Sequence, residues 1–274
     1  MRCGAFLVAA LLVIVAQDNG DLDVITLHDV DCGLEGTPGG SEGQRDLNRH
    51  KNRYEIPDEG ELDPDVSLPA LLAPGKDVKR FDQEKAARIL GFVINVKSGG
   101  SESCNCGATN PDERDTHIEL CLAAAAPETQ RVVAEVTPRL RMLKKKAGED
   151  WRTPALEKAI KGKWVQVTGW LTFDTAHIKQ AENTNPGHKG NWRATCWEIH
   201  PVTDIKVLDN APAEAATFNP DSLAAMHRLH AAHVAAAPNG KAGLAKLHKQ
   251  SLSKFHKKEL KEAETEAEER RPRP

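Results

Sequence analysis

Hydrophobic and polar residues alternate in five stretches through the middle of the chain. A period of two is typical of strands that bury one face. Gly91 and Gly169 fall inside the first and fourth stretches, which suits strands that bend sharply. The predicted strands are 89–97, 115–122, 131–137, 163–174 and 195–207, the last bent at Pro201.

Helical sequence separates the third and fourth predicted strands, at 139–146 and 153–160. Thr153 is the expected N-cap of the second segment, with Pro154 in the first helical position. Three strands, helical sequence and two strands is the element order of an OB-fold. We therefore predict a mainly β fold, a small five-stranded OB-like barrel over 86–209. A different small β-barrel or an open α+β sheet is the alternative.

The flanks differ from this domain in composition. Residues 17–85 are rich in Asp, Glu, Gly and Pro, and predict an extended N-terminal arm that packs on the barrel with one short helix. Residues 210–274 are rich in Ala, His, Lys and Glu. They predict a helical, partly disordered tail, with helices over 221–236 and 242–269. All five tryptophans lie within 151–197, which indicates a single core.

The first residues have the pattern of a secretory signal peptide. Arg2 precedes an uncharged apolar run over 5–16, and polar residues follow it. Twelve apolar residues are too few to cross a bilayer comfortably. We expect residues 1–16 to be removed and the protein to be periplasmic or extracellular. The alternative is a buried strand or helix at a true N-terminus.

An exported protein can form disulfides. Five cysteines follow residue 16, so at least one is free or pairs with another chain. Neighbours as close as Cys104 and Cys106 do not easily bond to each other, so each is expected to pair elsewhere, with Cys121 or Cys196 as the candidate partner. Metal ligation and free thiols are the alternatives. The disulfide candidates are Cys104, Cys106, Cys121 and Cys196.

Unusual polar residues gather where an OB-fold commonly binds ligands, on the outer face of its second and third strands and in the loops after the first and fourth. Ile118 and Leu120 face the barrel interior, so Asp115 and His117 face outward. Histidines with carboxylates suit a divalent ion such as zinc or manganese, and calcium is a further candidate. The predicted metal ligands are Asp115, His117, Glu119, Asp174, His177, Glu198 and His200.

A metal ion at this place would suit hydrolysis, with phosphodiesters as the first substrate class. Glu135 is a candidate base or ligand, and Arg139 or Arg193 would stabilise developing charge. No spacing matches a strong metal motif such as HExxH. The alternative is that these strands carry polar residues only because they are exposed to solvent. The net charge of −3 does not support tight nucleic-acid binding.

Two non-catalytic functions compete with hydrolysis. In a binding module for nucleic acid or oligosaccharide, Trp170 and Trp192 would offer stacking surfaces beside Arg193. In a structural envelope protein, the histidines and carboxylates would form a hydrogen-bonded brace beneath the N-terminal arm. A cleft with converging polar groups would favour the enzyme, and a covered, fully paired cluster would favour the brace.

Six motifs stand out along the chain: LNRHKNR (47–53), ESCNC (102–106), RDTH (114–117), EVTPR (135–139), GWL (169–171) with Asp174 and His177, and WEIHPV (197–202). They resemble those of a group of bacterial exported proteins of unknown function. The resemblance spans about residues 30–207 and implies the same domain limits and polar residues, but no reaction. At the level of fold alone, the chain is similar to OB-fold nucleases that cut phosphodiesters with carboxylates and a metal.

Overall fold

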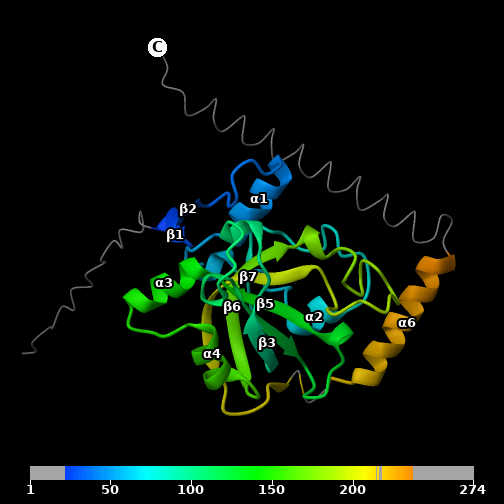
Figure 1. Cartoon of the computed structure of the whole chain (residues 1–274). Helices are drawn as coiled ribbons and strands as arrows, with labels where there is room; N and C mark the ends of the chain where they lie inside the picture. Colours follow the sequence, from blue (N-terminus) through cyan, green and yellow to red (C-terminus); the bar gives the residue numbers. More distant parts are fainter. Residues whose placement is uncertain (1–21, 214, 216–217, 237–274) are drawn as a thin grey trace, which may run out of the picture.

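Five strands close into a barrel in the order β3-β4-β5-β7-β6. The structure is a computed structural model that describes residues 22–213, 215 and 218–236 (Figure 1). Strands β5 and β7 pair in parallel and the other neighbours are antiparallel. The predicted mainly β, OB-like barrel is confirmed. The strands are β3 (Ala86–Ser98), β4 (Thr116–Cys121), β5 (Val132–Val136), β6 (Trp164–Phe173) and β7 (Trp197–Val207).

Alternate residues of these strands fill the barrel, among them Ile118, Leu120 and Leu171, which are fully buried. Gly169 allows β6 and β7 to approach closely. A Cβ there would lie 2.2 Å from the carbonyl oxygen of Pro201, and the β6–β7 register shifts at this point. The glycine is needed for the close approach of two backbones.

Two helices, α3 (Pro138–Lys146) and α4 (Thr153–Ile160), connect β5 to β6. The predicted N-cap at Thr153 is wrong, because Arg152 occupies the cap position without a side-chain bond. The Thr153 hydroxyl instead lies 2.6 Å from the Thr116 hydroxyl on β4. A tertiary hydrogen bond therefore replaces the local cap.

The segment before the barrel was expected to be an extended arm with one short helix. It holds a hairpin, β1 (Val24–Leu27) with β2 (Val30–Gly33), and the helices α1 (Glu42–Lys51) and α2 (Leu68–Leu72). Helix α1 contacts β6 and β7, and α2 contacts β3 and β5. The buried residues of α1 are Asn48 and Lys51, so no apolar periodicity marks this helix in the sequence.

A disulfide joins Cys32 of β2 to Cys106 in the β3–β4 connection. The predicted pairing of Cys106 with Cys121 or Cys196 is therefore wrong, and both of these, like Cys104, are buried free thiols. The partner of Cys106 comes from the N-terminal hairpin, which strand periodicity does not place beside the barrel.

Helix α6 (Pro220–Ala236) confirms the helix predicted over 221–236 and lies along one side of the barrel (Figure 1). The predicted signal peptide, 1–16, and the second tail helix, 242–269, lie outside the described residues. No helix in the described part of the chain is long and apolar enough to cross a membrane.

Candidate functional site

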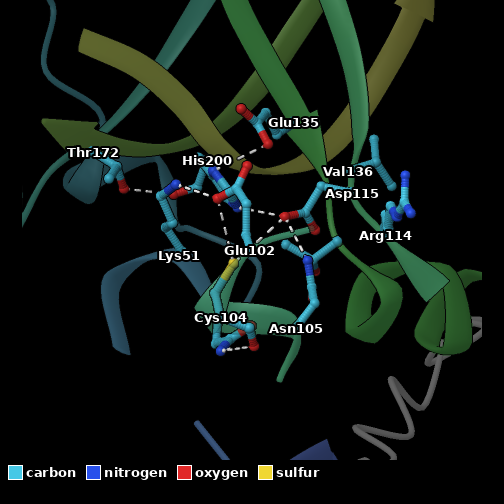
Figure 2. Close-up of polar contacts among 12 residues, drawn as sticks. Lys51, Glu102, Cys104, Asn105, Arg114, Asp115, Glu135, Val136, Thr172 and His200 are labelled. Atoms are coloured by element: carbon cyan, nitrogen blue, oxygen red, sulfur yellow. Dashed lines mark hydrogen bonds and ion pairs between the residues drawn. The ribbon is translucent and has the colours of Figure 1, made fainter. Parts of the chain in front are cut away.

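Charged side chains from five elements meet at one end of the barrel (Figure 2). They come from α1, the β3–β4 connection, β4, β5 and β7. We call them the central cluster. Its members are Lys51, Glu102, Asp115, His117, Glu135, Glu198 and His200.

His117 of β4 lies directly opposite Glu135 of β5 in the antiparallel ladder. Its Nε2 is 3.1 Å from Glu135 Oε2 and 3.8 Å from Glu102 Oε1. Burial opposes protonation of this imidazole, but Glu135 and Glu102 overcome it and raise the pKa of His117 to about 10. At neutral pH, the proton on His117 therefore offsets part of the negative charge of these two carboxylates.

Glu135 is completely buried, and neither carboxylate oxygen accepts a hydrogen bond from any described residue. Its Oε2 is in ion-pair contact with His117 and lies 3.6 Å from His200 Nδ1, without the geometry of a hydrogen bond. A buried carboxylate without hydrogen bonds is costly. A bound cation would supply the coordinating partner that the two oxygens of Glu135 lack.

Asp115 is buried beside the loop that carries Cys104 and Asn105 (Figure 2). Its Oδ2 accepts a 2.8 Å hydrogen bond from Asn105 and a 3.6 Å contact from the Cys104 thiol, and lies 3.8 Å from His200 Nε2. Its Oδ1 has no hydrogen-bond partner among the described residues. Burial, opposed by His200 and reinforced by Glu135, raises the pKa of Asp115 to about 6.

A chain of polar contacts fixes the ring of His200. Its Nδ1 lies 3.1 Å from Glu198, and Glu198 receives a 2.7 Å hydrogen bond from Arg193. Burial acts against ionisation of Glu198, but Arg193 outweighs it and holds its pKa well below the usual range. With Nδ1 directed at a carboxylate, Nε2 of His200 is left facing Asp115, as in histidines that bind metals.

Lys51 brings an ammonium group into the cluster from helix α1. Its Nζ is 2.7 Å from Glu102 Oε2 and 2.7 Å from Asp174 Oδ2. Burial opposes the charge on Lys51, but Asp174 and Glu102 raise its pKa well above the usual value. Sequence reasoning did not select Lys51 or Glu102 as site residues. Both residues belong to motifs that stand out in the sequence, Lys51 to LNRHKNR and Glu102 to ESCNC.

Three groups of side chains in the central cluster and the adjacent Cys104 could hold a cation. In each, one donor atom per residue lies within 4.8 Å of the others. We name two of them. The outer set is Glu102, His117 and Glu135; the inner set is Asp115, Glu135 and His200; the third group is Glu102, Cys104 and Asp115.

A cleft of about 850 Å³ opens beside the outer set. Its walls come from helix α1, the loop after β3 and the loop after β6, and Lys51, Glu102 and His117 reach it. The loops after the first and fourth barrel strands are those expected to line a ligand site in this fold. Two residues of the outer set, Glu102 and His117, therefore line the cleft, whereas Glu135 and the other two residues of the inner set are fully buried.

Four of the predicted metal ligands lie outside these groups, and one of them, Glu198, pairs with Arg193 and His200. Glu119 is paired with Lys97 at 2.7 Å and with Arg131 at 2.8 Å. Asp174 binds Lys51 and accepts a hydrogen bond from the backbone N–H of Ala176. His177 is 2.6 Å from Gln180 and packs edge-on against Trp192 in the wall of the cleft.

The predicted charge-stabilising arginines are both fully buried and occupied elsewhere. Arg139 donates to the carbonyls of Leu22 and Cys32 and to Asn52, so it fixes the N-terminal segment to α3. Arg193 donates to Glu198 and to a backbone carbonyl. The sequence could not show which way these guanidinium groups turn, because their partners are distant in the chain.

The two predicted stacking tryptophans have different surroundings. Trp170 donates to the carbonyl of Glu55, and Arg53 covers its ring at 4.8 Å, so it does not offer a free stacking surface. Trp192 lines the cleft, and Lys97 lies 5.7 Å from its ring centre. Only Trp192 of this pair is among the residues that line the cleft.

The sequence matches no known protein-family model and no curated protein. Among solved structures, the chain is similar to asparaginyl-tRNA synthetase of Entamoeba histolytica in complex with asparaginyl-adenylate, with 13% identity and a TM-score of 0.25. A second structure of that enzyme gives 14% identity and a TM-score of 0.24. Each match covers 59% of this chain and 31% of the synthetase. Similarity this low carries no argument about function.

Proposed function

We propose that this protein is an exported, metal-dependent hydrolase, with phosphodiesters as its first substrate class. The observation that carries the proposal is the carboxylate of Glu135. It is buried, has no hydrogen-bond donor among the described residues, and faces both His117 and His200. A cation between these groups would coordinate the oxygens of Glu135, which have an ion-pair contact with His117 but accept no hydrogen bond.

The outer set would hold the catalytic ion, because Glu102 and His117 reach the cleft. An ion there would leave positions open for water and substrate, as catalytic sites require. It would polarise a phosphoryl oxygen and lower the pKa of bound water. Water adds to phosphorus and the bond to one ester oxygen breaks. The proton that the water loses is balanced by the proton that the leaving alcohol gains.

The first experiment measures the metal content of the purified protein, before and after incubation with Mn²⁺ or Zn²⁺. A Glu135→Gln variant removes the shared charge while keeping the side-chain shape. Glu119→Gln is the matched control, because Glu119 lies on the same face of the β4–β5 ladder as Glu135 but is already paired with Lys97 and Arg131. We expect metal in the parent and the control, and a loss of at least about tenfold in affinity for Glu135→Gln.

The second experiment measures cleavage of bis(p-nitrophenyl) phosphate with and without a chelator. We expect chelator-sensitive release of nitrophenol that Mn²⁺ restores and that Glu135→Gln abolishes. Metal binding without turnover of any phosphodiester would reject the hydrolase and leave a metal-binding module. Absence of metal binding in the parent would reject the proposal altogether.

A structural brace is the second candidate, because the inner part of the cluster is buried and Lys51 of the N-terminal segment lies over it. A brace should satisfy its own polar atoms, and the Arg193–Glu198–His200 chain largely does so. The oxygens of Glu135 and Asp115 that lack hydrogen bonds among the described residues favour a bound cation over a brace. A parent protein that stays metal-free and melts at the same temperature with and without Mn²⁺ would favour the brace.

Export is supported by the Cys32–Cys106 disulfide, since such bonds persist in oxidising compartments. Intact-mass measurement after bacterial expression tests it. We expect a mature protein that lacks about the first 16 residues and carries one disulfide. A full-length, fully reduced chain would contradict export.

A further inference from the structure

The outer and inner sets share one side chain, Glu135. It has two carboxylate oxygens, and neither accepts a hydrogen bond from a described residue. A carboxylate with both oxygens available is the usual bridge between two metal ions in hydrolytic sites. The proposed function uses only the outer side of this bridge.

The inner side has its own unsatisfied atoms. Asp115 Oδ1 and His200 Nε2 lack hydrogen-bond partners in the described part of the chain, and both residues are buried. His200 is held in place by Glu198, which Arg193 fixes in turn. Such an outer carboxylate commonly orients a histidine that binds a metal through its other nitrogen.

Cys104 is a less suitable inner ligand. Its thiol lies 3.7 Å from Glu102 Oε2 and 3.6 Å from Asp115 Oδ2, and its single proton can be donated to either carboxylate. Coordination would require the loss of that proton and of both contacts. His200 Nε2 has no hydrogen bond to lose, because it is without a partner among the described residues.

The net charge of the site also favours two divalent ions over one. Five carboxylates are in ion-pair contact with Lys51 or with a histidine of the central cluster. Among the described residues, the permanently charged side chains that pair with these carboxylates are Lys51 and Arg193. When metal ions replace the protons on the cluster histidines, the imidazoles are neutral and three negative charges remain. One divalent ion would leave the site negative and repel a phosphodiester, whereas two would make it positive. The carboxylates are Glu102, Asp115, Glu135, Asp174 and Glu198.

We propose that the central cluster binds a pair of divalent cations bridged by Glu135. Glu102 and His117 complete the outer position, and Asp115 and His200 complete the inner one. This rests on the proposed function and extends it. In a two-metal site, one ion activates the attacking water and the other stabilises the leaving oxygen.

Mn²⁺ is the probe that tests the pair. The full chain is stripped with chelator and titrated with Mn²⁺ by calorimetry, and electron paramagnetic resonance is recorded at saturation. We expect about two ions per chain and the spectrum of an exchange-coupled pair. His200→Gln should retain one ion and give the spectrum of isolated Mn²⁺, and so should His117→Gln. Glu119→Gln is the control and should keep the coupled pair.

The outcomes separate this proposal from the proposed function. One uncoupled ion in the parent, unaffected by His200→Gln but lost in His117→Gln, overturns the pair and leaves a single-metal hydrolase. No bound ion in the parent overturns both. Far-ultraviolet circular dichroism checks that each variant folds. If His200→Gln does not fold, Asp115→Asn takes its place, and the coupled or uncoupled spectrum of the parent still decides.

Discussion

Glu119 and Glu135 lie on the same face of the β4–β5 ladder, and both are buried, but their surroundings are opposite. Glu119 is ion-paired with Lys97 and Arg131. Glu135 faces a histidine and other carboxylates, and no described residue donates a hydrogen bond to it. The difference teaches that burial alone does not separate a structural carboxylate from a ligand. What separates the two is whether the carboxylate has a fixed cationic partner, as Glu119 does and Glu135 does not.

The largest expected effect comes from making a paired carboxylate resemble Glu135. Arg193→Ala would leave Glu198 buried and without its guanidinium partner. We expect the free energy of unfolding in urea, followed by tryptophan fluorescence, to fall by about 3–5 kcal/mol. Replacing both residues by methionine should recover most of the loss. A loss below about 1 kcal/mol for Arg193→Ala would mean that partners matter less than this comparison requires.

The second prediction concerns His117 in the metal-free protein. Its folded pKa is raised to about 10, so its contribution to stability is complete below about pH 6.5 and is lost as pH rises through 10. We expect the free energy of unfolding to fall over that range by a few kcal/mol. His117→Gln should flatten the fall. Metal should bind more tightly as pH rises, because it must displace this proton.

The third prediction concerns Asp115, whose folded pKa is raised to about 6. A raised pKa favours the protonated form, so this contribution to stability is present below about pH 4 and is lost as pH rises through 6. The difference in unfolding free energy between Asp115→Asn and the parent should therefore grow between pH 4 and 6 in favour of the variant. A pH-independent difference would show that Asp115 is not held in an unfavourable site.

The smallest effect is expected at the exposed edge of the Glu119 pair. The Lys97 side chain is about half exposed, so its pairing with Glu119 is weakened by solvent. Lys97→Ala should change the free energy of unfolding by less than about 1 kcal/mol, and less still in high salt. A larger, salt-independent loss would mean that the two ends of the ladder are more alike than the contacts indicate.

Strand periodicity predicted the barrel well because each strand keeps alternate apolar residues in one core, as β6 does between Trp164 and Phe173. The same rule placed Asp115, His117 and Glu135 on surfaces that converge. It did not reveal Lys51, because α1 buries polar rather than apolar residues. Nor did it show that Arg139 turns toward Leu22, since that contact joins residues far apart in the chain.

Lys51 belongs to a helix that precedes the barrel, yet its ammonium group contacts Glu102 and Asp174, which follow strands β3 and β6. The barrel is therefore not a self-contained module. A version trimmed to strands β3–β7, or those strands grafted into another protein, would carry the architecture without this counter-charge. Shared barrel strands alone would be a poor guide to which relatives have the same chemistry. The more informative mark would be an LNRHKNR-like helix ahead of the barrel.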